Sequence, residues 1–225
     1  MALSGTGFLF AAADMAPETD YDFNEWYNRE HVPERLGITG FIRGRRFVAL
    51  TDSGPQYATL YETETPEAFT TEEYVGYVEN PDENARHFLP KFSGITRTIG
   101  RIRHTVGRGD GGVVAFMPLT PLAGQDDVLR DWLTKEVMPA LIKQHGVMAA
   151  HLLEKDTAVL AVSNRRHYRK GGGGELDWVL ALEAATQDDA VAAGRALLSE
   201  DDLTARGAKP GAVLTPYRLL YCLTK

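Results

Sequence analysis

The stretch DYDFNEWYNREHVPERLGITGFIRGRRFVAL, residues 20–50, decides the fold because its plan returns later in the chain. Four unlike residue types recur at a spacing of 106 positions: Trp26 and Trp132, Glu30 and Glu136, Pro33 and Pro139, and Gly40 and Gly146. A length of 225 residues also suits two units of ~100 residues each. The sequence therefore predicts a tandem repeat, with a first unit over residues 1–108 and a second, diverged unit over 109–225.

The composition is that of a globular protein, with 44% apolar and 24% charged residues. A net charge of −7 argues against binding to nucleic acid or to an anionic membrane surface. The single Cys222 has no partner for an internal disulfide, and the first residues lack the order of a secretory signal. No apolar run approaches the ~18 residues that cross a bilayer. We therefore expect a cytoplasmic protein, with Cys222 packed in its last strand.

The elements expected in each unit follow from hydrophobic periodicity and turn residues. The first unit shows strands at 7–15, 40–50, 57–62 and 95–104, a helix from 20 or 22 to about 37, and broken helix over 67–91. Pro33 is expected to bend the end of the first helix. After a linker at 107–112, the second unit shows strands at 113–119, 147–154, 178 onward and 212–223, with helices at 126–144 and 188–199. Its longer hairpin, 164–176, contains a GGGG run that is typical of a flexible loop, not of a phosphate-binding motif.

The order β-α-β-β-α-β predicts an α+β fold of two ferredoxin-like units, each an antiparallel sheet with helices on one face. Two such sheets packed sheet to sheet bury both bare faces and form a pseudo-dimeric α+β barrel. On the inner face of this barrel we expect Tyr57, Thr59 and Tyr61, with Ala58 and Leu60 turned toward the helices.

A resemblance to a known family rests on seven residues: Trp26, Tyr27, Glu30, His31, Pro33, Arg35 and Leu36, which match the pattern W-Y-x-x-E-H-x-P-x-R-L. Together with YATLYETETPEAF, which begins at Tyr57, they resemble EthD-like members of the dimeric α+β barrel superfamily. The resemblance implies the fold more than an activity. Proteins of that superfamily include cofactor-free monooxygenases, muconolactone isomerases, polyketide cyclases, haem-dependent proteins and many with no known reaction.

His31 breaks the symmetry of the repeat, because its counterpart in the second unit is Val137. An imidazole exchanges protons near neutral pH, so His31 is the first candidate for a general acid or base, with Tyr27 one helical turn away on the same face. The competing interpretation is a structural histidine that bonds a backbone group beside Pro33. Glu30 and Glu136 occur in both units and are expected to be structural.

Arg43 and Arg45 have two possible roles: they bind a carboxylate or enolate, or they form a salt-bridged strand edge. His151 stands at the position of Arg45 in the second unit, which keeps a polar group there. We therefore expect catalysis by His31, Tyr61 and Arg45. The expected ligand-binding residues are Tyr27, Arg43, Tyr57, Thr59 and His151.

No cofactor and no metal are expected, because no Cys/His cluster has metal-ligand spacing and the lone His87 is a weak basis for haem. The first hypothesis is a cofactor-independent lyase, isomerase, cyclase or oxygenase acting on a small apolar or aromatic, oxygen-bearing metabolite. The alternative is a non-catalytic or stress-associated protein that holds such a ligand. A small molecule is the expected ligand under both hypotheses. Whether two tandem chains also pair through an exposed sheet edge, as a homodimer, stays open at this point.

Overall fold

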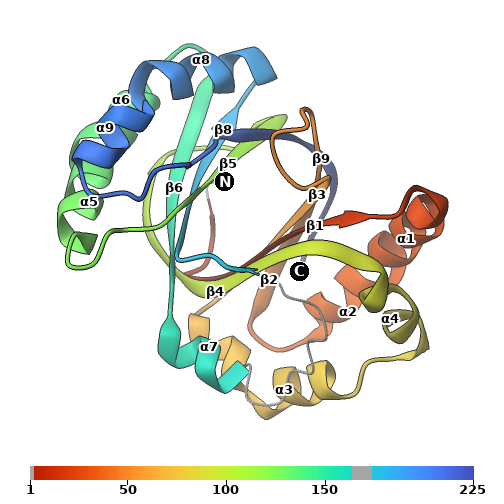
Figure 1. Ribbon diagram of the computed structural model, residues 1–225. Helices are drawn as coiled ribbons and strands as arrows, with labels where there is room; N and C mark the ends of the chain where they lie inside the picture. Colours follow the sequence, from red (N-terminus) through yellow and green to blue (C-terminus); the bar gives the residue numbers. More distant parts are fainter. Residues whose placement is uncertain (1–2, 164–173) are drawn as a thin grey trace.

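A closed eight-stranded antiparallel barrel forms the centre of the computed structural model, which describes residues 3–163 and 174–225 (Figure 1). The ring order is β1-β3-β2-β9-β5-β8-β6-β4, and β4 pairs with β1 to complete it. The strands of the ring are β1 (Gly7–Met15), β2 (Phe41–Ala49), β3 (Tyr57–Thr63), β4 (Phe92–Gly107), β5 (Val113–Leu119), β6 (Val147–Lys155), β8 (Trp178–Ala184) and β9 (Thr215–Thr224). The two-residue β7 (Gly174–Glu175) pairs in parallel with β4. The expected α+β class and barrel are confirmed.

The two halves of the chain meet at strand edges, whereas we expected two sheets packed face to face. The first half supplies β4-β1-β3-β2 and the second supplies β9-β5-β8-β6, so the seams are β2–β9 and β4–β6. The 16-residue β4 is longer than expected because it serves both halves, pairing with β1 along its first part and with β6 along its second. Edge pairing satisfies the backbone groups that two separate sheets leave open.

Helices cover the outside of the barrel in two groups on opposite sides (Figure 1). The first half contributes α1 (Asp20–Trp26), α2 (Val32–Gly37), α3 (Glu72–Glu79) and α4 (Glu83–Phe88). The second half contributes α5 (Asp126–Trp132), α6 (Met138–Leu141), α8 (Gln187–Leu197) and α9 (Glu200–Ala205), with α7 (Thr157–Ser163) lying near α3. Short 3-10 turns are η1 (Pro17–Thr19), η3 (Pro66–Thr70) and η4 (Leu89–Lys91). Within the described ranges no helix is long and apolar enough to cross a membrane.

A single π-helical turn interrupts the first long helix of each half, at η2 (Tyr27–His31) and η5 (Leu133–Val137). In each case the next residue is followed by a proline, Pro33 or Pro139. A proline ring inside an α-helix clashes with the carbonyl four residues before it, and a wider turn relieves that clash. The bend expected near Pro33 is therefore a π turn, and His31 is its last residue.

Side chains alternate between a core inside the barrel and two cores under the helices. The inner core draws on strands all around the ring and includes Phe8, Phe10, Phe47, Ala58, Leu60, Phe116, Val179, Ala181 and Tyr217. Our expectation for β3 was therefore wrong, because Ala58 and Leu60 point inward while Tyr57 and Tyr61 pack under the helices. An eight-stranded barrel has an interior that side chains must fill. Phenylalanines from β1, β2 and β5 fill it, leaving room only for small or aliphatic residues at positions 58 and 60 of β3.

Several smaller expectations have clear outcomes. The helices α7 and α9 were not expected from the sequence. Cys222 is exposed, whereas we expected it to be packed. The part of the insert from Asn164 to Gly173, which includes the first three glycines of the GGGG run, lies outside the described residues.

Candidate active site

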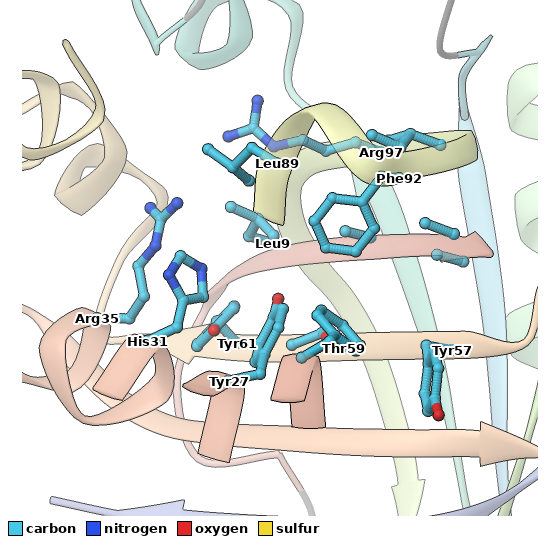
Figure 2. Close-up of a pocket in the computed structure, with 15 residues that line it drawn as sticks. Leu9, Tyr27, His31, Arg35, Tyr57, Thr59, Tyr61, Leu89, Phe92 and Arg97 are labelled. Atoms are coloured by element: carbon cyan, nitrogen blue, oxygen red, sulfur yellow. The ribbon is translucent and has the colours of Figure 1, made fainter. Parts of the chain in front are cut away.

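A cavity of about 110 Å³ lies in the first half, between the outer face of the barrel and the helices that cover it. Figure 2 shows its lining as sticks, with His31 and Arg35 side by side at one end and Tyr57 at the other. Its walls are mostly aromatic and aliphatic: Leu9, Ala11, Ala12, Ala13, Phe23, Tyr27, His31, Arg35, Tyr57, Thr59, Tyr61, Leu89, Phe92, Ile95 and Arg97. A concave apolar site with a few polar groups is the usual form of a small-molecule pocket.

His31 is buried, with 5% of its surface exposed, because the π turn directs it against the aromatic core. Its ring centre lies 4.6 Å from that of Tyr27 and 4.8 Å from that of Trp26. Burial, and then the positive charges of Arg35 and Arg46, hold the pKa of His31 well below its usual value of 6.5. His31 is therefore neutral at pH 7, with one ring nitrogen that carries a proton and one that accepts.

The Nδ1 atom of His31 lies 3.3 Å from the hydroxyl of Tyr77, and that hydroxyl donates to Glu34 Oε2 at 2.9 Å. The Nε2 atom has no hydrogen-bond partner within the described part of the chain. An imidazole with one nitrogen tethered and the other free has the form of a general base.

Arg35 follows His31 by one helical turn and extends beside it (Figure 2). Its guanidinium lies over the ring of Tyr77, 4.7 Å from the ring centre. The Nε and Nη1 atoms are buried, and no described residue accepts a hydrogen bond from them. A buried cation with free N–H donors favours a negatively charged oxygen placed beside it.

Hydroxyl groups line the floor of the cavity. Tyr27 extends its hydroxyl toward the centre in Figure 2. Tyr61 is 2% exposed, and its hydroxyl is buried and lacks a partner among residues 3–163 and 174–225. Burial, with Tyr27 nearby, raises the pKa of Tyr61 well above its usual value of 10.0, so it stays a donor. Tyr57 contributes its ring only, because its hydroxyl donates to Asp20 Oδ1 at 2.5 Å, away from the cavity.

Most of the polar residues of this cavity have apolar counterparts in the second half. At the spacing of 106 positions, Tyr27, His31 and Arg35 correspond to Leu133, Val137 and Leu141. After the longer hairpin the spacing is 121, so Thr59 and Tyr61 of β3 correspond to Leu180 and Leu182 of β8. These five apolar residues pack in the core under the helices of the second half. The helix-covered barrel thus forms without these polar groups. Their presence in the first half is therefore not a requirement of the fold.

The expected site residues separate into two groups. His31, Tyr27, Tyr57, Thr59 and Tyr61 meet at the cavity. The other three, Arg43, Arg45 and His151, are absent from its lining and lie inside the barrel, which corrects our expectation that they share a site with His31.

Inside the barrel, Arg43 and Arg45 form buried ion pairs, and the pair between Arg45 and Glu183 joins the two halves. Arg45 Nη1 donates to Glu183 Oε1 at 2.7 Å, and Arg43 Nε donates to Glu62 Oε1 at 2.5 Å. His151 is fully buried near them, and its Nδ1 lies 3.0 Å from the Thr105 hydroxyl. The salt-bridge interpretation of Arg43 and Arg45 therefore fits the structure. Their charges are met by carboxylates from within the chain.

Sequence reasoning missed Arg35 and Arg97 as cavity residues. A signal for Arg35 was present, since Tyr27, His31 and Arg35 recur every four residues and so share one helix face. Arg97 lies on β4, where nothing in the sequence marks the face it takes. Its Nη2 atom donates to the hydroxyl of Tyr74 at 2.8 Å.

Comparison with solved structures supports the fold. An anthrone oxidase-like protein superposes with a TM-score of 0.65 at 14% identity, covering 100% of this chain and 95% of its own. A putative monooxygenase from Fusobacterium nucleatum gives 0.62 at 11% identity, covering 98% of this chain and 95% of its own. A haem-binding protein from Thermus thermophilus gives 0.55 at 11%, covering 98% and 93%. No protein-family model and no curated protein sequence matches the chain. At these identities the likeness establishes the α+β barrel fold.

The haem-binding neighbour overturns our expectation of a site that works without a cofactor, because the same fold accommodates haem there. The residues of this cavity do not fit a porphyrin. A cavity of ~150 Å³ takes up a benzene, and the 110 Å³ here is smaller still. His87, the residue considered for haem, is exposed, with its Nε2 2.6 Å from Lys91 Nζ, and it does not line the cavity. No group of three His, Cys, Asp or Glu residues within the described ranges is arranged to hold a metal ion.

Proposed function

We propose that the protein is an enzyme that removes a proton from a small aromatic, oxygen-bearing metabolite, with His31 as general base and Arg35 beside the oxygen that becomes negative. One observation carries the proposal. A buried, neutral imidazole, whose Nε2 has no hydrogen-bond partner among the described residues, lies next to a guanidinium whose buried Nε and Nη1 have no acceptor there, in a cavity with aromatic walls.

The chemistry follows from the charges. A phenol O–H, or a C–H beside an aromatic ketone, gives its proton to His31 Nε2 and leaves a phenolate or enolate. The imidazolium and the oxyanion then form together in a site of low dielectric, where the Arg35 charge acts strongly. Because the pKa of His31 is low, the base is already free of its proton at pH 7. Tyr61 supplies a second donor to the oxyanion.

The cavity is smaller than the ~150 Å³ that takes up a benzene, so it limits a ligand to one ring that reaches out of the cavity, or to one ring of a larger ligand. Leu89, which is 44% exposed, lines the cavity where it meets the surface, so further rings have a way out past it. An oxygenase-type reaction suits this chemistry, because a deprotonated phenol or enol is electron-rich. The anthrone oxidase-like and monooxygenase neighbours point the same way.

The apolar counterparts of the cavity residues in the second half support an origin by duplication, after which only the first half kept a ligand site. We infer that residues 1–108 and 109–225 derive from one EthD-like unit, since both π turns stand at corresponding positions. Selection for packing alone would favour residues such as Val137 and Leu141 in both halves. A function confined to the first half explains why His31 and Arg35 differ from them.

Hydrogen–deuterium exchange tests the proposal without knowledge of the natural substrate. Anthrone and substituted phenyl ketones are incubated in D₂O with the protein, and exchange at the acidic C–H is followed by mass spectrometry, with oxygen uptake in parallel. We expect His31→Val to lower the protein-dependent exchange rate by ~10²–10⁴-fold, the usual contribution of a general base. Val137→Ala, at the corresponding position, is the control and should retain the rate.

Two outcomes contradict the proposal. One is exchange by His31→Val at the wild-type rate. The other is tight binding of a probe with no exchange and no oxygen uptake across the panel, which would favour the alternative of a non-catalytic binding protein.

A further inference from the structure

Tyr77 of α3 and Glu34 of α2 form a short chain of contacts that leads from His31 to the surface. His31 Nδ1 lies 3.3 Å from the Tyr77 hydroxyl, and Tyr77 lies 2.9 Å from Glu34 Oε2. Glu34 and Tyr77 also line a separate surface groove, together with Glu73 and Asp82. The chain therefore begins at the candidate active site and ends in contact with water.

The direction of these hydrogen bonds is fixed by the number of protons available. An ionised carboxylate only accepts, so Tyr77 must donate its single proton to Glu34. The oxygen of Tyr77 is then left to accept, and His31 Nδ1 must carry the hydrogen. Burial, together with Glu34, raises the pKa of Tyr77, which keeps that proton in place. Glu34 is exposed at the groove. Partial burial, and then the charges of Asp82 and Glu30, raise the pKa of Glu34, whereas the hydrogen bond from Tyr77 lowers it by stabilising the ionised form.

We propose that Tyr77 and Glu34 are positioning residues that hold His31 in the Nδ1–H tautomer, so that the lone pair of Nε2 is the one offered to the cavity. The proposal rests on the proposed function of His31 as a base. The same contacts stabilise the cation that forms when Nε2 takes up a proton, because Nδ1–H still points to an oxygen backed by a carboxylate.

The second half of the chain gives independent support. At the spacing of 106 positions, Glu34 corresponds to Ala140, just as His31 corresponds to Val137. The carboxylate is therefore absent from the half that lacks the imidazole. If Glu34 served only solubility or helix stability, a glutamate would suit the corresponding position of the second half equally well, whether or not a histidine stood three residues before it.

Nuclear magnetic resonance of the full chain tests the proposal with no substrate present. Two-bond and three-bond ¹H–¹⁵N correlations report which nitrogen of each histidine carries hydrogen, and His31→Asn assigns the His31 signals. We expect wild-type His31 to be protonated at Nδ1. In Glu34→Ala, Tyr77 is free to donate to Nδ1, so we expect the hydrogen to move to Nε2.

Two further variants separate positioning from packing. Glu34→Gln keeps an oxygen that can accept from Tyr77 and should retain the Nδ1–H form. Glu73→Ala, in the same groove, removes a carboxylate that bonds the Thr39 backbone N–H and not Tyr77, and should leave the tautomer unchanged. A wild-type His31 protonated at Nε2, or a Glu34→Ala signal equal to wild type, overturns the proposal.

Exchange kinetics then distinguish this proposal from the proposed function. If both hold, Glu34→Ala lowers kcat for deuterium exchange by about 10-fold or more with little change in KM, because a histidine in the wrong tautomer carries hydrogen on the nitrogen that must accept the proton. If His31 has the expected tautomer but wild type catalyses no exchange, the proposed function fails and the positioning role stands. If wild type catalyses exchange but the tautomer of His31 is unchanged in Glu34→Ala, the proposed function stands and the positioning role fails.

Discussion

The stability of the barrel at acidic pH should depend strongly on His151, which is fully buried inside it. Burial, followed by the charges of Arg45 and Arg43, lowers the pKa of His151 from 6.5 to about 3, while Asp110 acts weakly in the opposite direction. In the unfolded chain His151 therefore takes up a proton below pH 6.5, whereas in the folded chain it takes up a proton only near pH 3. The contribution of the neutral His151 to the free energy of unfolding is fully present above pH 6.5 and is lost as the pH falls toward 3.

The size of the effect follows from the same values. Between those two pKa values, one histidine makes the free energy of unfolding fall by about 1.4 kcal/mol per pH unit. Over the whole interval, from 6.5 to about 3, the loss is about 5 kcal/mol. A typical domain has only ~5–15 kcal/mol of stability. We therefore expect His151 to be a source of acid lability in this chain, together with His31, whose pKa burial also lowers.

Urea unfolding of wild type and His151→Leu at pH 7, 6, 5 and 4 measures this contribution directly. The substitution has its own cost at pH 7. Below pH 6, the free energy of unfolding of the variant minus that of wild type should rise by about 1.4 kcal/mol for each pH unit. Glu183, whose pKa is raised by burial, titrates in both proteins. The exposed His87→Gln is the control and should run parallel to wild type. Parallel curves for His151→Leu would refute the reasoning.

Further expectations concern the two arginine sites. Arg35→Met should lower protein-dependent deuterium exchange by ~10²-fold while phenol binding is nearly kept, because its charge acts on the oxyanion; equal loss of binding and rate would assign it to ligand affinity instead. Arg43→Met leaves Glu62 without its closest cation inside the barrel and should cost ~3–5 kcal/mol in urea unfolding. The exchange rate per folded molecule should stay at the wild-type value, since Arg43 does not reach the cavity; a large drop would place the barrel cluster in catalysis.

Sequence reasoning reached the class of fold because its signals can be read along the chain. Strand alternation and the proline near the end of each first helix depend on sequence neighbours, and the tryptophan and glycine positions repeat at a fixed spacing of 106 residues. The way in which β4 and β9 cross between the halves depends on edge pairing between distant strands, and no local pattern encodes it. Helix α7 was missed because its seven residues adjoin a divergent insert.

The candidate site was predicted in part for a related reason. Spacing shows that Tyr27 and His31 share a helix face and that Tyr57, Thr59 and Tyr61 share a strand face, but not which side of the sheet that strand face takes. Which side of β3 faces inward depends on what fills the barrel, and the phenylalanines of β1, β2 and β5 decide this. Placing Arg45 beside His31 failed because the two sides of one sheet are separated by its backbone.

The proposed binding of a ligand under the helices of the first half is tested most directly by filling the cavity. Thr59 lines the cavity, and its counterpart Leu180 fills the same position in the second half. Phenol binding is therefore measured by NMR titration of wild type and Thr59→Leu. We expect the His31 signals of wild type to shift on binding, and Thr59→Leu to bind at least about 10-fold more weakly, or 1.4 kcal/mol. Unchanged affinity in Thr59→Leu, or ligand shifts confined to His151 inside the barrel, would contradict the account.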